Sequence, residues 1–355
     1  MRIGMLTGGG DCPGLNAVIR AVVRKGIFHY NDDFMGYLEG WRGVMDNNTM
    51  PLNLETVAGI LPRGGTILRT SRTNPSKRED GLEQCLANLN RARIDALICI
   101  GGDDTNSVTQ QLHERGFRVV GIPKTIDNDL NGTDQCFGFD TAVTIATEAI
   151  DRVHTTAEAH NRVIVVEVMG RDSGWIAIYS GIAGGADVII IPERPFHITE
   201  IAESLKRRHE RGRYFSIVVI AEGAKMADEN DPSKSSLVTT AAGNDEFGHA
   251  RLGGVGTIIA GQIEKLTGYE TRAVILGHTQ RGGSPTAFDR VLASRYGIGA
   301  IDLVHSGGFG QLVALRQNKI IGIPLIEALA ENRKVPTDLI EVALGLQDKA
   351  IQAVK

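Results

Sequence analysis

Cysteine is scarce in this 355-residue sequence, and no two cysteines form a C-x-x-C pair. The four thiols, Cys12, Cys85, Cys99 and Cys136, are too few and too scattered for the disulfide framework of a secreted domain. The sequence also lacks a secretory start and any uncharged apolar run of about 18 residues, the length that a membrane-spanning helix requires. We therefore expect a cytoplasmic protein that neither crosses nor targets a membrane.

A strong charge of one sign is missing as well. The chain has 38 Lys and Arg residues against 42 Asp and Glu residues, a formal net charge of -4. This balance excludes a global basic footprint for nucleic acid or an anionic membrane. Hydrophobic residues make up 42% and charged residues 23%, so the chain is not largely disordered. Its length fits two α/β domains better than one small module.

Glycine, by contrast, is abundant. It supplies 43 of the 355 residues, about 12% against a usual ~7%. Short apolar runs at 2–6, 96–100 and 119–122 end in glycine-rich or polar loops, and helix-period segments follow. Strand, loop and helix in this recurring order are typical of a mostly parallel sheet covered by helices, where sites gather beyond the carboxyl ends of the strands. We therefore expect the three loops to converge.

A second series of apolar runs follows a long helical stretch at 141–160. Because continuous apolar residues indicate strands buried on both faces, the runs at 162–169, 186–191 and 216–222 predict a second sheet. The fold class is therefore α/β, with two Rossmann-like three-layer αβα domains, mostly parallel sheets, and the active site in the cleft between the domains. We assign 1–138 and 279–334 to a larger domain and 139–278 and 335–355 to a smaller one, with an exposed polar insertion near 224–250.

The first loop, Gly8-Gly9-Gly10, precedes a predicted helix. Successive glycines let backbone amides approach an anion closely, and the helix N-terminus offers its dipole, so a phosphate is the expected guest. The alternative is a tight strand-to-helix turn, since neither the Rossmann nor the Walker fingerprint is present.

The second and third loops carry pairs of carboxylates. Asp103 and Asp104 follow a buried strand, where carboxylates suit hydrated Mg²⁺; the alternative is that one of them caps the next helix. Asp127 and Asp129 stand two positions apart in non-helical sequence. Close carboxylates push their pKa values apart, so one of the pair stays a base near neutral pH. A solvated acidic turn is the alternative for this pair.

Two further segments, at 63–73 and 278–285, combine cations with glycines. Side-chain charge and backbone amides together suit the binding of phosphoryl groups. Taken alone, each segment is equally compatible with a surface turn.

Taken together, these motifs resemble the phosphofructokinase superfamily along nearly the whole chain. The matching segments stand in the family's order and spacing, at 7–16, 101–103, 125–129, 168–171, 221–223 and 276–285. The insertion near 224–250 and the C-terminal tail match weakly. The resemblance implies Mg²⁺-dependent transfer of a phosphoryl group to the C1 hydroxyl of fructose 6-phosphate. It also implies that the larger domain binds the phosphoryl donor and Mg²⁺, and the smaller domain the sugar phosphate.

The resemblance assigns roles residue by residue. Asp127 is the base that takes the proton of the C1 hydroxyl, Asp129 supports it, and Asp103 organises Mg²⁺. The residues with a catalytic role are Asp127, Asp129, Thr125, Lys124, Arg72 and Arg171. The residues that bind the phosphoryl donor are Gly9, Gly10, Arg72, Asp104, Thr105 and Lys124. The residues that bind the sugar phosphate are Thr125, Asp127, Arg162, Met169, Gly170, Arg171, Glu222, Arg272, His278 and Arg281.

Two of these arginines imply an oligomer. Arg162 and Arg272 match arginines that, in the family, reach the 6-phosphate from a neighbouring subunit. We therefore expect a homodimer or homotetramer in which both arginines cross the interface.

The choice of phosphoryl donor depends on Asp104 and Lys124. Bacterial family members that use ATP generally have glycine at both positions, although some ATP enzymes also carry the lysine, whereas members that use pyrophosphate have aspartate and lysine. The Asp104 carboxylate would occupy the space of the α-phosphate of ATP and repel it, while Lys124 would hold pyrophosphate as a point charge. The pair therefore predicts pyrophosphate as the donor.

The sequence is also compatible with two alternative functions. One is an ATP-dependent 6-phosphofructokinase that tolerates Asp104. The other is a catalytically silent sugar-phosphate-binding regulatory subunit, against which the intact Asp103, Thr125, Asp127 and Arg171 argue.

Overall fold

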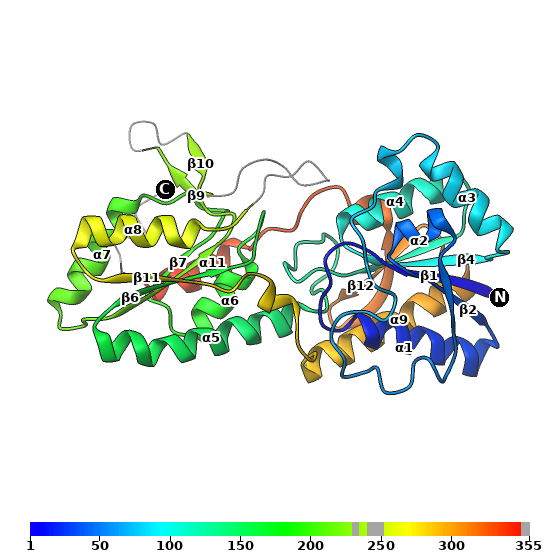
Figure 1. The fold of residues 1–355 in the computed structure, drawn as a ribbon, viewed down its shortest axis with the longest axis horizontal. Coiled ribbons are helices and arrows are strands. Elements are labelled where there is room, and N and C mark those ends of the chain that lie inside the picture. The colour runs from blue at the N-terminus through cyan, green and yellow to red at the C-terminus, as the bar shows by residue number, and fades with distance from the viewer. Residues whose placement is uncertain (229–233, 240–251, 349–355) are drawn as a thin grey trace. The chain divides into compact units, whose positions relative to one another are not determined.

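The computed structural model describes residues 1–228, 234–239 and 252–348, and the chain divides into two compact units (Figure 1). Unit 1 consists of Met1–Thr141 and Arg281–Asn332, and unit 2 of Ala142–Gln280 and the segment that begins at Arg333. The predicted domain boundaries at 138, 278 and 334 differ from these by two or three residues. The roles predicted for the two domains stay predictions.

A seven-stranded sheet forms the centre of unit 1. Its order is β13-β12-β5-β4-β1-β2-β3. Pairing is parallel throughout except at the two edges, where β3 and β13 run antiparallel to their neighbours. The strands are β1 (Arg2–Thr7), β2 (Asp33–Tyr37), β3 (Thr49–Leu52), β4 (Ala96–Gly101), β5 (Val119–Pro123), β12 (Gln311–Arg316) and β13 (Lys319–Pro324). The strands predicted at 2–6, 96–100 and 119–122 are thereby confirmed.

Helices cover both faces of this sheet (Figure 1). Alternate residues of a strand point to opposite faces, and Leu97 and Cys99 of β4 pack in one core cluster with residues of α2, α3 and α4. On the other face α1 and α9 pack against each other, and α9 packs against β5. All six residues of β4 are therefore buried. The helices are α1 (Leu15–Lys25), α2 (Trp41–Asp46), α3 (Gly81–Arg91), α4 (Asp103–Glu114), α9 (Ala287–Ser306) and α10 (Leu325–Ala328).

Unit 2 has a four-stranded parallel sheet in the order β11-β6-β8-β7. Its strands are β6 (Val163–Val168), β7 (Val188–Ile190), β8 (Ser216–Ala221) and β11 (Thr271–Ile275), which confirms the predicted second sheet. One face packs on α7 (Ile198–Glu210) and α8 (Val255–Thr267). The opposite face is covered by α5 (Phe139–His160) and α6 (Trp175–Ala183), and α11 (Thr337–Gly345) packs on α6.

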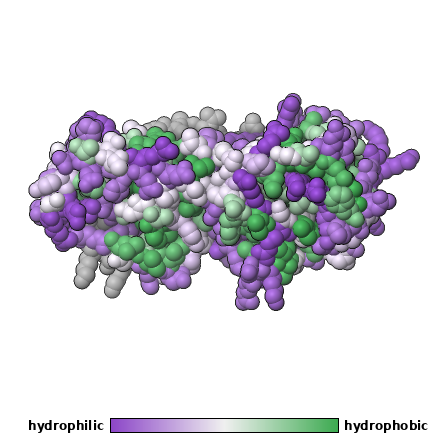
Figure 2. All heavy atoms as spheres, turned by 90° about the horizontal axis from the view of Figure 1, so that it is seen from below, coloured by the Kyte–Doolittle hydropathy of each residue, from purple (hydrophilic) through white to green (hydrophobic). Residues whose placement is uncertain are grey.

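The predicted insertion near 224–250 is described only in part. Lys225–Ala227 (β9) and Ser235–Leu237 (β10) form an antiparallel pair, while 229–233 and 240–251 lie outside the described residues. On the face shown in Figure 2, polar residues cover most of the surface and hydrophobic residues form separate patches. Within the described part of the chain, every helix is too short or too polar to cross a membrane.

Candidate active site

The glycine loop between β1 and α1 lies against two polar side chains of unit 1. A Cβ atom on Gly8 would stand 2.4 Å from Thr105 Oγ1, and one on Gly10 would stand 2.7 Å from Arg281 Nη1. Gly9 has φ +75, a conformation that favours glycine. These approaches explain why the loop is built from glycine. They also leave its backbone free of side chains beside a hydroxyl and a cation.

Two cations reach this loop. The buried Lys124 donates from Nζ to Gly10 O at 2.5 Å, and Arg281 donates from Nη1 to Asp11 O at 3.3 Å. Burial lowers the pKa of Lys124, an effect that Cys12, Asp103 and Asp11 oppose and that Arg281 reinforces. A polyanion bound here would gain two positive partners and would favour the charged form of Lys124.

The segment that carries Arg72 is hydrogen-bonded to the same glycine loop. Thr70 donates from Oγ1 to Gly9 O at 2.5 Å, two positions before the exposed Arg72. Buried Asn16 holds the preceding residues, since its Nδ2 donates to Arg63 O at 3.1 Å and its Oδ1 accepts from Ile67 N at 2.9 Å. The sequence motifs predict no role for Asn16 or Thr70. The sequence does contain one indication of such a role, an asparagine among the apolar residues that the first helix buries. A buried amide must find hydrogen-bond partners.

The two acids after β4 do not cap the helix that follows. Helix α4 begins at Asp103, and the residue at its N-cap position is Gly102. The capping alternative is therefore wrong. Asp103 and Asp104 both lie in the first turn, where the helix dipole favours negative charge, and Thr105, the next residue, is the side chain that contacts Gly8.

The acids after β5 form a hydrogen-bonded turn. Thr125 Oγ1 donates to Asp129 Oδ1 at 3.1 Å and accepts from Asp127 N at 3.1 Å. Asn128 is buried in the left-handed conformation, and its Oδ1 accepts from Cys136 N at 2.8 Å. Burial, then the charge of Asp127, then that of Asp103, raises the pKa of Asp129 to about 7. This environment argues against a solvated acidic turn and places acids from the ends of β4 and β5 within electrostatic reach of one another.

The acids fit magnesium better than a metal held by protein alone. Among the residues that the structure describes, no group of three or more His, Cys, Asp or Glu side chains is arranged to hold a metal ion. Mg²⁺ normally keeps several waters and takes only one or two carboxylates together with phosphate oxygens. Asp103, near Asp129 and the loop that suits a phosphate, matches that kind of donor set.

A second row of predicted site residues lies at the carboxyl ends of the strands in unit 2. Met169, Gly170 and Arg171 follow β6, and Glu222 follows β8. Glu222 N donates to Val168 O at 2.9 Å and Gly223 N to Gly170 O at 3.0 Å, so the two strand ends stay paired. His278 follows β11, on the other side of β6. The strand order thus sets five predicted sugar-phosphate residues in one row.

Arg162 and Arg272 lie at the opposite end of this sheet. Arg162 directly precedes β6, about 20 Å from the carboxyl end of that strand at the usual rise, and Arg272 is the second residue of β11, about 10 Å from its carboxyl end. Both guanidinium groups pair with Glu270, at 2.8 Å from Arg162 Nε and 2.6 Å from Arg272 Nη2. Within unit 2 the structure therefore brings the two arginines together but keeps them apart from Met169 and Glu222.

The predicted site residues thus fall into three groups. Unit 1 holds the donor loop, the acids and their neighbours: Gly9, Gly10, Arg72, Asp103, Asp104, Thr105, Lys124, Thr125, Asp127, Asp129 and Arg281. The row in unit 2 contains Met169, Gly170, Arg171, Glu222 and His278. Arg162 and Arg272 form the third group.

Comparison with known proteins agrees with this chemistry. A family model described as Phosphofructokinase matches residues 2–304. The pyrophosphate–fructose 6-phosphate 1-phosphotransferase of Amycolatopsis methanolica is 56% identical over 343 residues, which cover 97% of this chain and 98% of that protein. The ATP-dependent 6-phosphofructokinase 3 of Streptomyces coelicolor is 48% identical over 336 residues, 95% of this chain and 97% of that protein.

A solved phosphofructokinase structure has a similar fold. Pichia pastoris phosphofructokinase in the T-state aligns with a TM-score of 0.81 at 32% identity, covering 99% of this chain and 38% of that longer chain. The family model and the relatives each match most of the sequence, and this chain belongs to the phosphofructokinase family.

Proposed function

We propose that this chain is an enzyme that transfers a phosphoryl group reversibly from pyrophosphate to the C1 hydroxyl of fructose 6-phosphate, in the presence of Mg²⁺. The products are fructose 1,6-bisphosphate and phosphate. The proposal is supported by relatives at 55–56% identity that are named for this activity. We place the reaction in the cytoplasm.

The observation that carries the donor assignment is the environment of Lys124 and Asp104. Lys124 presents its ammonium at Gly10 O, inside the loop that suits a phosphate, whereas Asp104 adds a carboxylate in the first turn of α4. Pyrophosphate needs concentrated positive charge and backbone donors, which Lys124, Arg281 and the glycine loop supply. ATP additionally needs room and a neutral path for its α-phosphate and nucleoside, and Asp104 opposes both.

The acids beyond β5 suit the activation of the acceptor hydroxyl. We assign Asp127 as the base and Asp129 as its support. A proton on Asp129, whose pKa is raised to about 7, reduces the repulsion that a second charge on the pair would experience. Thr125 orients both acids through the two hydrogen bonds described above.

Charge on the moving phosphoryl group needs separate stabilisation. Mg²⁺, held through Asp103, would neutralise charge on the phosphate oxygens. Arg72 and Lys124 add fixed positive charge from the protein. Phosphoryl transfer depends mainly on such positioning and electrostatics, rather than on covalent chemistry by the enzyme.

We assign the row in unit 2 to the sugar phosphate. Met169, Glu222 and His278 bind the sugar, and Arg171 lies beside them. Arg162 and Arg272, at the opposite end of the sheet, serve the 6-phosphate of a neighbouring subunit in a homodimer or homotetramer. Because both arginines lie away from the sugar-phosphate residues of their own unit, the arrangement supports a role in the site of another subunit.

One assay tests the reaction class. Fructose 1,6-bisphosphate is measured after incubation of fructose 6-phosphate and Mg²⁺ with pyrophosphate, with ATP, or with neither. We expect product with pyrophosphate and little with ATP. Product with ATP alone supports the ATP-dependent alternative, and no product with either donor supports a silent sugar-phosphate-binding subunit.

A further inference from the structure

We infer that Gln280 is a positioning residue for the sugar-phosphate site, an inference that rests on the proposed function. Gln280 is 0% exposed. Its Oε1 accepts from Met169 N at 3.3 Å, and its Nε2 donates to Gly277 O at 3.2 Å. One buried amide therefore joins the loop after β6 to the 3₁₀-helix Gly277–Arg281 that follows β11.

The place of this amide follows from where the strand pairing stops. β11 and β6 pair in parallel as far as Ile275 opposite Glu167, and Leu276 N still donates to Glu167 O at 3.0 Å. At Gly277 the chain adopts φ +47 and turns into the 3₁₀-helix. The Gln280 side chain supplies the next link between the two strands, at Met169.

This link lies between two groups that we assign to fructose 6-phosphate. Met169, Gly170 and Arg171 stand on one side of it and His278 on the other. The contact requires a group that accepts and donates at once, and glutamine does both, whereas leucine of similar size does neither. Without the amide, the buried N–H of Met169 and the partly buried C=O of Gly277 lose this partner. The spacing of the two loops would then be set less firmly.

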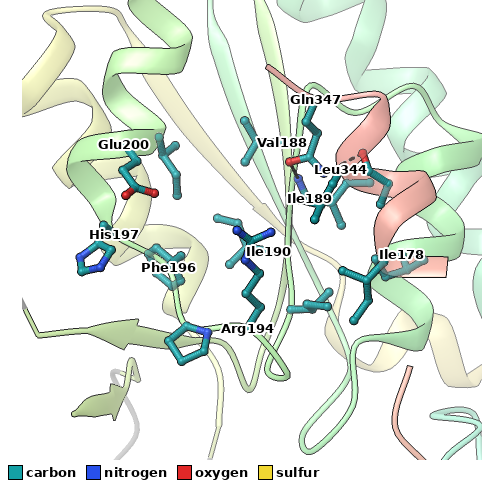
Figure 3. A pocket seen from close by; sticks show the side chains of 15 residues that line it. Ile178, Val188, Ile189, Ile190, Arg194, Phe196, His197, Glu200, Leu344 and Gln347 are labelled. Atoms are coloured by element: carbon teal, nitrogen blue, oxygen red, sulfur yellow. Dashed lines mark hydrogen bonds between the residues drawn. The ribbon is translucent and has the colours of Figure 1, made fainter. Parts of the chain in front are cut away.

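Gln347 is a matched control within the same unit. It is also buried, its Oε1 accepts from Ile189 N at 3.4 Å, and its Nε2 donates to Ala343 O at 3.2 Å. Figure 3 shows it beside the edge strand β7, at an apolar cavity of about 40 Å³ that none of the predicted site residues lines. Replacing Gln347 thus removes the same two kinds of hydrogen bond without touching the loops after β6 and β11.

The first test compares Gln280→Leu with Gln347→Leu. We expect Gln280→Leu to raise KM for fructose 6-phosphate about 10- to 100-fold, with a smaller change in kcat and with KM for pyrophosphate within about twofold of wild type. Gln347→Leu should lower the melting temperature to a similar degree and leave both KM values unchanged. An unchanged KM for fructose 6-phosphate in Gln280→Leu, or an equal rise in Gln347→Leu, overturns the inference.

The second test uses pH. In Gln280→Glu, a protonated carboxyl group accepts from Met169 N and donates to Gly277 O as the amide does. The ionised form cannot donate to Gly277 O and is repelled by that oxygen, which moves the side chain out of the position that holds Met169 N. The ratio of its KM for fructose 6-phosphate to the wild-type KM should therefore fall as the pH is lowered from 8 to 6. Taking the ratio at each pH removes the titration of substrate and of other site residues. A ratio that does not change with pH contradicts the positioning role.

A third measurement separates this inference from the proposed function. Hydrogen exchange followed by mass spectrometry reports on the loops whether or not the protein phosphorylates fructose 6-phosphate. Peptides that contain 169–171 and 277–281 should exchange faster in Gln280→Leu than in wild type, and at the wild-type rate in Gln347→Leu. Equal exchange in all three proteins overturns the link itself, whereas an inactive wild type overturns only the function.

Discussion

The charge state of Asp129 and Asp127 is central to the proposed chemistry at the scale of single residues. Burial and two neighbouring acids raise the pKa of Asp129 to about 7, so a proton there is available near neutral pH. This proton lowers the electrostatic cost of keeping Asp127 as an acceptor next to phosphate groups. The proposed mechanism therefore assigns Asp127 as the base and Asp129 as its support.

Asp127→Asn should lower kcat by about 10²- to 10⁴-fold, because a general base contributes about that much. Substrate binding should change little, since the side chain keeps its volume. The measurement is steady-state kinetics with both substrates, and exposed Asp33→Asn serves as the control. Turnover at the wild-type rate in Asp127→Asn would remove Asp127 from the mechanism.

Asp104→Gly and Lys124→Met should affect the two donors differently. The first removes a carboxylate and its volume, so the use of ATP should rise while pyrophosphate use falls only modestly. The second removes the buried cation at Gly10 and should lower kcat/KM for pyrophosphate about 10- to 100-fold, as expected for a lost charged contact of about 1.5–3 kcal/mol. An unchanged donor preference in Asp104→Gly contradicts the exclusion argument.

At the scale of elements, one carboxylate joins the beginnings of α5 and α9. Asp289, buried in the first turn of α9, accepts at Oδ2 from Thr141 N at 2.8 Å and from Thr141 Oγ1 at 2.5 Å. Thr286 caps α9 by accepting from Asp289 N. Burial raises the pKa of Asp289 from 3.8 to about 6. Between about pH 4 and pH 6 the folded protein therefore keeps the Asp289 carboxyl group protonated, whereas in the unfolded chain this group is ionised.

The raised pKa predicts a pH dependence of stability. A carboxyl group with a raised folded-state pKa stabilises the fold below pH ~4, and this contribution is lost as the pH rises through about 6. In Asp289→Asn the contribution does not titrate, so the fall in stability between pH 4 and 7 should shrink by about 1–3 kcal/mol. Melting temperatures across this range test it, with exposed Asp46→Asn as the control. Equal pH dependence in Asp289→Asn and wild type would contradict it.

The elements that the sequence predicted well are those buried on both faces. β4 is a continuous apolar run and β6 is interrupted only by Glu167, and all six residues of each strand are buried. The antiparallel edge strands were not predicted. β3 contains Pro51, and β13 contains Gly322 and ends at Pro324, residues that are typical of edges and turns. These strands form because they pair with β2 and β12. The local pattern of apolar residues in the sequence does not reveal such pairing.

The candidate site shows the same limit. Residues that follow buried strands, such as Asp103, Asp127 and Met169, could be singled out because parallel strands end at one edge. Asn16, Thr70 and Gln280 could not, since their roles consist of hydrogen bonds to segments between 51 and 111 positions away. Long-range contacts of single polar side chains leave no periodic signal in the sequence.

At the scale of the whole molecule, the proposal requires that subunits complete each other's sites. Arg272→Ala and Asp127→Asn should each be nearly inactive alone. When the two variants are mixed and allowed to exchange subunits, a hybrid contains one site with both residues intact, so about a quarter of the wild-type sites return in a dimer. Activity of the mixture is the measurement. Absence of recovery, with subunit exchange verified, would place Arg272 in the site of its own chain.

The preference of the wild-type protein for one phosphoryl donor decides whether Asp104 and Lys124 select pyrophosphate. The measurement is kcat/KM of the wild-type protein for pyrophosphate and for ATP, at saturating fructose 6-phosphate and Mg²⁺. We predict that the value for pyrophosphate exceeds that for ATP by about 100-fold or more, because Lys124 attracts the first donor and Asp104 excludes the second. Efficient turnover with ATP and none with pyrophosphate would contradict the account of the donor site.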